Sequence, residues 1–360
     1  MELLSLHFGQ AGAGPKATLQ AALHADEIPG LLVAHHLRER LAALEAAGRI
    51  LGEVVLVPVA NPVGLAQRVL HSPLGRFELA SGENFNRHYA DLTETVAASV
   101  DGRLGADPAA NVEIIRAALR EAAAALPART QVESLRRVLL NLSIDADVVL
   151  DLHCDSQAVL HLYTETSAWP QAEPLARLMG AQAVLLAEVS GDNPFDEACS
   201  TPWPRLAARF GPATPVPSAC VAVTVELRGE SDVTHELAAR DAQALLDYLC
   251  WRGMIAPAPG DAPPVLPPLR AEATPLAGSI PVSAPHGGVV VYLRELGATV
   301  TAGERLADLI EPMSGLVTPL LSPVDGVLYV QERRRFVPTG TGVLRVAGRE
   351  AVRTGKLLSA

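Results

Sequence analysis

The sequence has no long apolar run, few cysteines and almost no lysine. Charged residues interrupt every apolar stretch before it reaches the roughly 18 residues that a membrane-spanning helix needs, so no membrane segment is expected. The first residues, MELLSLHFGQ, lack the basic region and the apolar core of a secretory signal. The four cysteines are widely spaced without a C-x-x-C pair, which favours free thiols in a reducing cytoplasm over a disulfide framework.

Positive charge is also scarce. Lys16 and Lys356 are the only lysines, and the formal net charge is -11. A phosphate backbone would be repelled, so no nucleic-acid partner is expected. Apolar residues, in contrast, make up 49% of the 360 residues, which suffices for one large domain and a smaller one.

The first 250 residues alternate short apolar runs with longer amphipathic stretches, which is the pattern of a layered α/β domain. Several runs are apolar nearly throughout, as strands covered on both faces should be. The predicted strands cover residues 17–23, 53–59, 147–152, 159–163, 183–186 and 222–227. Helices are predicted from Pro29 to a C-cap at Gly48, from Asp107-Pro108 onward, and from Asp232 to Tyr248.

The composition changes after this α/β region. Residues 257–268, PAPGDAPPVLPP, hold six prolines and predict a stiff linker, followed by an all-β stretch. Within that stretch residues 284–289 recur at 322–327, an offset of 38, and residues 300–303 recur at 337–340, an offset of 37. The expected organisation is an α/β domain over residues 1–255, a proline-rich linker over 256–278 and a small quasi-twofold β barrel over 279–350.

This predicted barrel resembles the biotinyl/lipoyl carrier fold. Carriers of that type bind their cofactor through a lysine at the hairpin between the two halves. The corresponding residues 310–315 read IEPMSG, and Lys356 lies beyond the barrel. The resemblance therefore implies the fold without the carrier chemistry, and a structural or substrate-gating role is expected.

A candidate metal site begins at the end of the first long predicted strand. His24 and Glu27 form an H-x-x-E pair there, and imidazole and carboxylate groups are the ligands of catalytic zinc. Open α/β sheets also place ligands at the carboxyl ends of strands. The alternative is a helix-entry histidine with an acidic residue near the helix N-terminus. A second match, His36 and Glu39, lies inside the following predicted helix and is not expected to bind metal.

A third ligand is predicted at the end of the strand over residues 147–152. His153 follows that strand, and Asp151 points to the same face, where it could orient the imidazole. The alternative is a buried, hydrogen-bonded histidine. Cys154 points to the opposite face and is not counted as a ligand, whereas Asp155 could approach the site.

A general base is predicted within a late apolar strand. Glu226 is the lone carboxylate there, and burying it unpaired is costly unless it is functional. Arg228 lies two residues on, so it could pair with Glu226 or bind substrate. Substrate binding is also assigned to Asn86 and Arg87 in a polar loop, because an arginine can hold a carboxylate through two hydrogen bonds. Arg87 could alternatively stabilise an oxyanion.

Taken together, these stretches resemble the succinylglutamate desuccinylase/aspartoacylase family of the zinc-carboxypeptidase superfamily. The matching stretches are residues 24–30, 61–62, 84–87, 151–155 and 224–229, in the family's order, with the C-terminal β region. The resemblance implies a three-layer α/β/α domain with a mixed sheet. It implies that His24, Glu27 and His153 bind one Zn²⁺ and that Glu226 is the general base.

The resemblance also implies how substrate is bound. Asn86 and Arg87 would hold the substrate carboxylate, and a further arginine would be either Arg68 or Arg76. Asn84-Phe85 stands where the family usually has aspartate-leucine. Residues 151–155 with 161–163 look closer to a branch that includes deacetylases of N-acetylated diamino acids.

Three functions are weighed for this chain. The first is a zinc-dependent amidohydrolase, acting on a small N-acyl amino acid with zinc-bound water activated by Glu226. The second is a metallocarboxypeptidase acting on small peptides. The third is a non-catalytic binding protein whose barrel binds a partner. No membrane partner is expected, and the chain could form a homo-oligomer.

Overall fold

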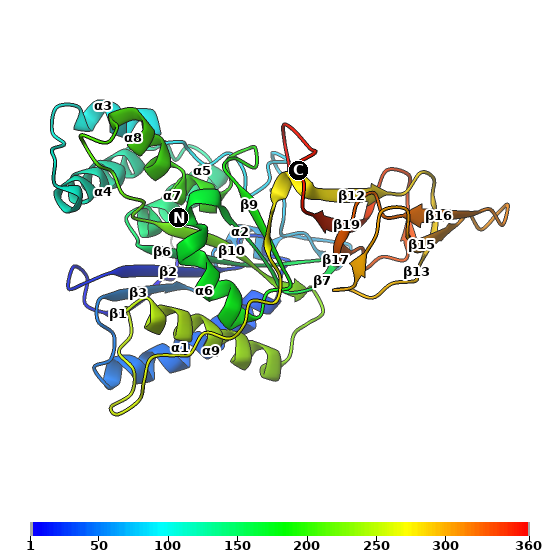
Figure 1. Cartoon of the computed structure of the whole chain (residues 1–360), viewed down its shortest axis with the longest axis horizontal. Coiled ribbons are helices and arrows are strands. Elements are labelled where there is room, and N and C mark those ends of the chain that lie inside the picture. The colour runs from blue at the N-terminus through cyan, green and yellow to red at the C-terminus, as the bar shows by residue number, and fades with distance from the viewer. Residues whose placement is uncertain (1–2, 359–360) are drawn as a thin grey trace.

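A mixed eight-stranded sheet forms the centre of this computed structural model, which describes residues 3–358 (Figure 1). The strand order is β1-β3-β2-β6-β10-β8-β9-β11, in which β1 and β8 run antiparallel to β3 and β10. The remaining neighbours are parallel. The strands are β1 (Leu6–Gly9), β2 (Lys16–Ala21), β3 (Glu53–Val57), β6 (Val148–Asp155), β8 (His161–Glu165), β9 (Ala183–Ala187), β10 (Val221–Gly229) and β11 (Ala273–Pro275). The predicted mixed α/β architecture is confirmed.

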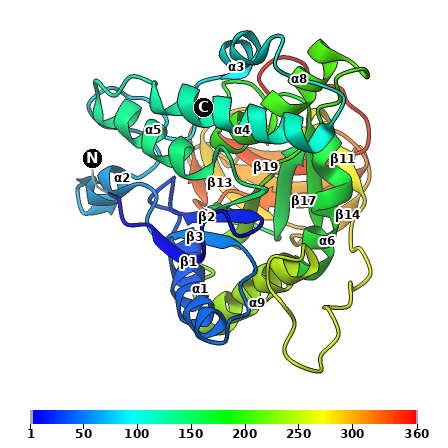
Figure 2. The same cartoon turned by 90° about the vertical axis from the view of Figure 1, so that its left-hand side faces the viewer.

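Helices cover both faces of this sheet because its strands are apolar on both sides (Figure 2). Leu56 and Leu150 pack toward α1 (Pro29–Ala46), α6 (Trp169–Met179) and α9 (His235–Trp251). Val55 and Val149 pack toward the other layer. That layer contains α3 (Thr93–Val100), α4 (Pro108–Ala124), α5 (Gln131–Ser143), α7 (Phe195–Ser200) and α8 (Pro202–Phe210).

The predicted strands are all present, with shifted ends. The largest shift is at β6, which continues through His153 to Asp155, so this histidine lies within the strand. The three predicted helices correspond to α1, α4 and α9, and Asp107 caps α4 through its carboxylate as the sequence suggests. Among the described residues no helix is long and apolar enough to cross a membrane.

The C-terminal repeat corresponds to two small sheets that enclose an apolar core of their own. One sheet has the order β12-β19-β17-β14 and the other β16-β15-β13-β18. The offset of the repeat relates each strand of one sheet to a strand of the other. For example, β12 begins at Ser279, and its counterpart β16 begins 38 residues later at Val317. The strands are β12 (Ser279–Ser283), β13 (Gly288–Tyr292), β14 (Thr299–Val300), β15 (Arg305–Ile310), β16 (Val317–Leu321), β17 (Gly326–Gln331), β18 (Phe336–Val337) and β19 (Gly342–Gly348).

The predicted linker over residues 256–278 requires a correction. Its residues 273–275 form β11, which pairs with β9 as the edge strand of the large sheet. The preceding part also contacts the α/β region, because Arg177 donates to the Pro267 carbonyl over 2.6 Å. The two regions also share a ladder, because β7 (Gln157–Ala158) pairs with β17. The small sheets are thus joined to the α/β region by backbone pairing, beside the carboxyl end of β6 (Figure 1).

Candidate metal centre and active site

The turn after β2 brings His24 and Glu27 to the sheet edge. Ala22 takes up a left-handed conformation (φ 60°), which is rare without glycine and bends the chain away from the strand direction. Asn61 fixes the bend, because its amide donates to the Leu23 carbonyl over 2.9 Å. Gly75 accepts a hydrogen bond from the Ala25 amide over 3.1 Å, which ties a second loop to the same turn.

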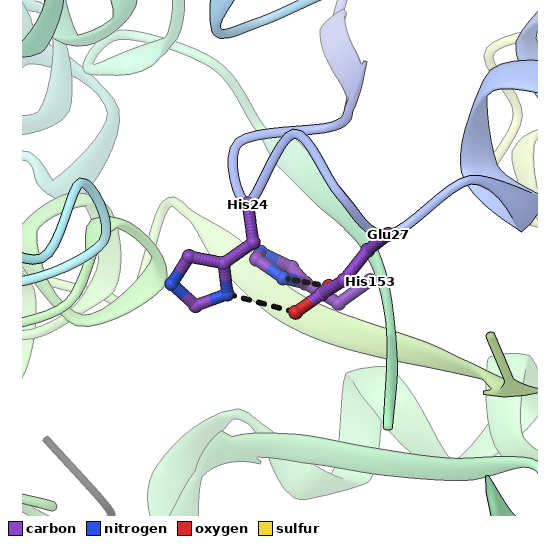
Figure 3. A group of neighbouring side chains, drawn as sticks. All are labelled: His24, Glu27 and His153. Carbon is purple, nitrogen blue, oxygen red and sulfur yellow. Dashed lines mark hydrogen bonds and ion pairs between the residues drawn. The ribbon is translucent and has the colours of Figure 1, made fainter. Parts of the chain in front are cut away.

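His24, Glu27 and His153 form a buried group in which the three ligand atoms lie within 4.8 Å of one another (Figure 3). One Glu27 oxygen lies 2.9 Å from Nδ1 of His24, and the other lies 2.8 Å from Nδ1 of His153. The three residues that the sequence assigns to a metal are therefore brought together. No other such group of histidine, cysteine and acidic residues occurs within residues 3–358.

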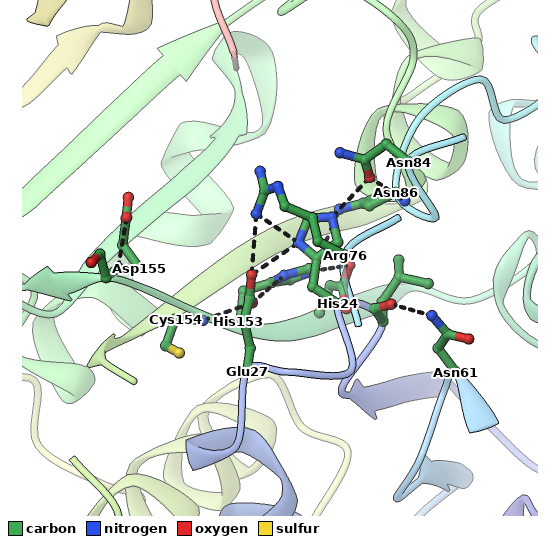
Figure 4. Close-up of polar contacts among 12 residues, drawn as sticks. His24, Glu27, Asn61, Arg76, Asn84, Asn86, His153, Cys154 and Asp155 are labelled. Carbon is green, nitrogen blue, oxygen red and sulfur yellow. Dashed lines mark hydrogen bonds and ion pairs between the residues drawn. The ribbon is translucent and has the colours of Figure 1, made fainter. Parts of the chain in front are cut away.

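Nε2 of each imidazole forms a hydrogen bond to a side-chain oxygen (Figure 4). Nε2 of His24 lies 2.9 Å from Oδ1 of Asn84, and Nε2 of His153 lies 2.9 Å from Oδ2 of Asp151. Because both partners are acceptors, Nε2 carries a proton in each ring, which leaves Nδ1 of each ring as the nitrogen that would coordinate a cation. Two imidazole lone pairs and a carboxylate facing one another fit a bound divalent cation.

The two histidines of the group differ in their electrostatics. Burial opposes charge on His153, but Asp151 and Glu27 outweigh it and raise the pKa of His153 well above its usual value. Burial and then the Arg76 charge lower the pKa of His24 to about 4. The guanidinium of Arg76 lies 3.2 Å from Nδ1 of His24 and 3.4 Å from Glu27, so a positive group already faces these ligand atoms.

Glu226 faces the same space. It is paired in register with His153 on the neighbouring strand, on the sheet face opposite the apolar Val225. Its Oε2 is buried and makes no hydrogen bond within residues 3–358. Burial and the Glu27 carboxylate raise the pKa of Glu226 to about 8. A buried carboxylate oxygen without a partner is costly, and such oxygens are more typical of functional groups than of structural ones.

A cavity of about 550 Å³ contains the triad and Glu226. Asn86, Arg87 and Arg76 also line it, whereas Arg68 lies exposed on the β4–β5 hairpin (Arg68–Val69 and Ser72–Pro73) outside it. The structure therefore places Arg76 at the site and not Arg68. Asn86 is fixed by the Phe195 amide, which donates to its Oδ1 over 2.9 Å.

Comparisons with known proteins show which family this chain resembles. Residues 13–251 match the succinylglutamate desuccinylase/aspartoacylase catalytic domain. The chain belongs to this family.

Solved structures of similar fold cover nearly the whole chain. A family protein from Shewanella amazonensis shares 28% identity, with a TM-score of 0.80 over 96% of this chain and 93% of that one. One from Shewanella frigidimarina shares 26% identity, with a TM-score of 0.79 over 96% and 92%. The product-bound ectoine utilization protein EutE of Ruegeria pomeroyi shares the fold, with 18% identity and a TM-score of 0.65 over 94% and 87%. No curated protein matched the sequence.

Because the family consists of deacylating hydrolases, this member is an enzyme of the hydrolase class. The side chain of Arg228 does not lie where the sequence predicts. The register of β10 shifts between Glu226 and Gly229, and Arg228 has a left-handed φ of 71°. This bulge turns its side chain to the other sheet face, where it pairs with Asp241 of α9 instead of Glu226 or substrate. His36 lies half-buried on α1 beside His235, outside the cavity.

Other residues of this family member support the site without having been predicted. Asn84 holds His24, and Arg136 of α5 fixes Asn84 by donating to its carbonyl over 3.0 Å. The Cys154 amide donates to Glu27 over 3.0 Å, so this residue acts through its backbone. Asp155 does approach the cavity, and it pairs over 2.8 Å with Arg345 of the C-terminal sheets. The C-terminal region thus forms part of the cavity wall.

Proposed function

We propose that this protein is a zinc-dependent hydrolase that cleaves the amide bond of a small N-acyl amino acid. The observation that carries the proposal is the unpaired, buried Oε2 of Glu226, in one cavity with the His24, Glu27 and His153 triad. His24, Glu27 and His153 would hold one zinc ion. When bound, zinc would polarise the substrate carbonyl and make water more acidic.

The residues of the chain supply the remaining steps. Asn86 and Arg87 bind the carboxylate of the amino-acid part and orient the amide. Glu226 accepts a proton from the attacking water as its oxygen bonds to the carbonyl carbon. The same carboxyl then donates that proton to the amide nitrogen as the C–N bond breaks, which yields a carboxylic acid and a free amine. Transfer of the remaining proton from the acid to the amine gives the carboxylate and ammonium products. Arg76 lies beside the triad and is placed to stabilise the developing oxyanion.

Replacement of the proposed base tests this assignment. In Glu226→Gln the protein should still bind one zinc per chain, whereas kcat should fall by about 10²–10⁴-fold, because the amide cannot accept the proton. Elemental analysis and hydrolysis of N-acetyl, N-formyl and N-succinyl amino acids measure the two effects. The exposed Glu236→Gln on α9 serves as control. Wild-type kcat in Glu226→Gln would remove Glu226 from the reaction.

The same assay separates the deacylase from a peptidase. Residues of the C-terminal sheets, among them Arg333 and Arg345, line the cavity beside the triad. This enclosure favours small substrates, so N-acetyl amino acids should be hydrolysed faster than dipeptides. A preference for dipeptides would favour the metallocarboxypeptidase, and a protein that binds no zinc would favour a non-catalytic role.

A further inference from the structure

One side of the cavity is apolar. Seven side chains line the cavity there and belong to a single apolar cluster, which we call the apolar wall: Tyr163, Leu185, Ala187, Leu276, Tyr329, Leu357 and Leu358. Two strands of the large sheet, the turn before β12, β17 and the last described residues supply them. At about 550 Å³ the cavity is in the size range of sites for drug-sized ligands, so it has room for more than an acetylated small amino acid.

Short contacts connect the apolar wall to the loop of Arg87. The Leu357 amide donates to the Ser190 carbonyl over 2.8 Å. The next residue back, Lys356, pairs over 2.8 Å with Asp192. The Asp192 carbonyl in turn accepts a hydrogen bond from the amide of His88, the residue after Arg87. The loop of Arg87 and the segment of Leu357 therefore lie close to each other, and both residues line the cavity.

We infer that the apolar wall binds the side chain of the amino-acid part, so that the substrates are N-acyl derivatives of amino acids with large apolar side chains, such as leucine, methionine or phenylalanine. This inference rests on the proposed function for the role of Arg87. The side chains of the wall are uncharged, and the two guanidinium groups beside it are already hydrogen-bonded, Arg345 to Asp155 and Arg353 to the carbonyls of Ser279 and Leu357. The side chain of aspartate or glutamate would therefore lose hydration against the wall.

Two measurements on the zinc-loaded protein test the inference. In hydrolysis, kcat/KM for N-acetylleucine should exceed that for N-acetylalanine by roughly 50-fold, since each of three additional carbons contributes about fourfold when buried. N-acetylaspartate should be the poorest of the three. In calorimetry, the product leucine should bind more tightly than alanine or aspartate.

Leu357→Ala supplies the matched variant, because this side chain is only half-buried and its loss leaves the sheets intact. The leucine-to-alanine ratio of kcat/KM should fall roughly tenfold in this variant. Leu293→Ala, at an exposed position of the C-terminal sheets outside the cavity, should keep the wild-type ratio.

Failure of this inference can be distinguished from failure of the hydrolase proposal. A protein that hydrolyses no N-acyl amino acid, yet binds leucine in a manner weakened by Leu357→Ala, would sustain the inference while the hydrolase proposal fails. A preference for N-acetylaspartate over N-acetylleucine would overturn it. A larger gain from N-hexanoylalanine over N-acetylalanine than from leucine over alanine would also overturn it, because the wall would then bind the acyl group.

Discussion

The two imidazoles of the triad differ in the group that holds Nε2. His153 is held by the charged Asp151, which also accepts a hydrogen bond from the buried Gln20 over 3.0 Å. His24 is held by the neutral Asn84. A carboxylate behind an imidazole raises its basicity and fixes its tautomer, whereas an amide fixes the tautomer alone. His153 should therefore be the stronger of the two histidine ligands.

Asp151→Asn tests this difference at a single residue. The variant keeps the shape of the side chain but removes its charge, so zinc affinity should fall by about 10–100-fold. Competition with a chelator of known affinity measures the change. Asp155→Asn is the control, because the carboxylate of Asp155 pairs with Arg345 and not with an imidazole. An equal loss of affinity in both variants would contradict the assigned role of Asp151.

The residues that sequence reasoning found share one property. His24 and His153 lie at or near strand ends, and Asp151 lies two residues before His153 on its strand, so local periodicity places them. Asn84 and Arg136 reach the site across more than fifty residues of chain, and no local pattern indicates such contacts. Arg228 was misplaced because period-two alternation fails at a bulge.

At the scale of structural elements, the loop before Arg76 packs closely on the metal-binding turn. A Cβ atom at Gly75 would lie 2.2 Å from the Asp26 amide and 2.5 Å from the Ala25 carbonyl carbon, so backbone would have to move. Gly75 thus permits the close approach between the loop that carries Arg76 and the turn that carries His24 and Glu27.

Gly75→Ala should therefore weaken zinc binding by about tenfold or more without unfolding the protein, since displacement of ligands by fractions of an ångström lowers affinity. Chelator competition and circular dichroism measure affinity and folding separately. Gly82→Ala in the following loop, where a Cβ would meet nothing within 4 Å, is the control, and its left-handed φ of 75° adds only local strain. Wild-type affinity in Gly75→Ala would show that the loop can move freely.

A second prediction concerns how α4 and α5 are held to the sheet. Asp145, which follows α5, accepts hydrogen bonds from Lys16 of β2 and Arg120 of α4. Burial opposes its charge, but Lys16 and Arg120 outweigh burial and lower the pKa of Asp145. A lowered carboxyl pKa stabilises the fold above the unfolded-state value of about 4, and this contribution is lost as the pH falls through the folded-state pKa.

Asp145→Asn should accordingly lower the free energy of unfolding by about 1 kcal/mol at pH 7. The difference from wild type should shrink at pH values below about 4, because protonated Asp145 no longer attracts the two cations. Urea unfolding at pH 7 and pH 3 measures both values. Asp101→Asn, at an exposed position, should show neither effect. A difference that stays constant with pH would rule out the charge interaction as its cause.

The central strands and long helices were predictable because burial on both faces leaves continuous apolar runs, and caps mark helix ends. β11 was not predictable, because its residues Ala273–Pro275 are only three and follow a proline-rich stretch. They form a strand because the folded chain passes beside β9, and such a long-range contact leaves no local sequence pattern. The internal repeat, in contrast, predicted two similar β units from sequence alone, and these correspond to the two small sheets, whereas closure into a barrel stays a prediction.

At the scale of the whole molecule, the C-terminal sheets and the α/β region both line the cavity, and they contact each other next to it. The β7–β17 ladder joins their backbones, and the pair of Asp155 and Arg345 joins a strand of the metal site to β19. Both side chains are partly buried, so the pair is screened less than one on the surface. The two regions should therefore unfold together.

All three tryptophans, Trp169, Trp203 and Trp251, lie in the α/β region, so their fluorescence reports on that region alone. Fluorescence and far-ultraviolet circular dichroism should give coincident urea transitions. Arg345→Gln should lower the stability reported by tryptophan by about 2 kcal/mol, although Arg345 lies in the other region, because Asp155 is left without its charged partner. Arg305→Gln, which breaks a pair with Asp308 inside the small sheets, should shift the fluorescence transition much less. A circular dichroism transition that moves in Arg345→Gln while fluorescence does not would mean that the cavity is built between two independently folding parts.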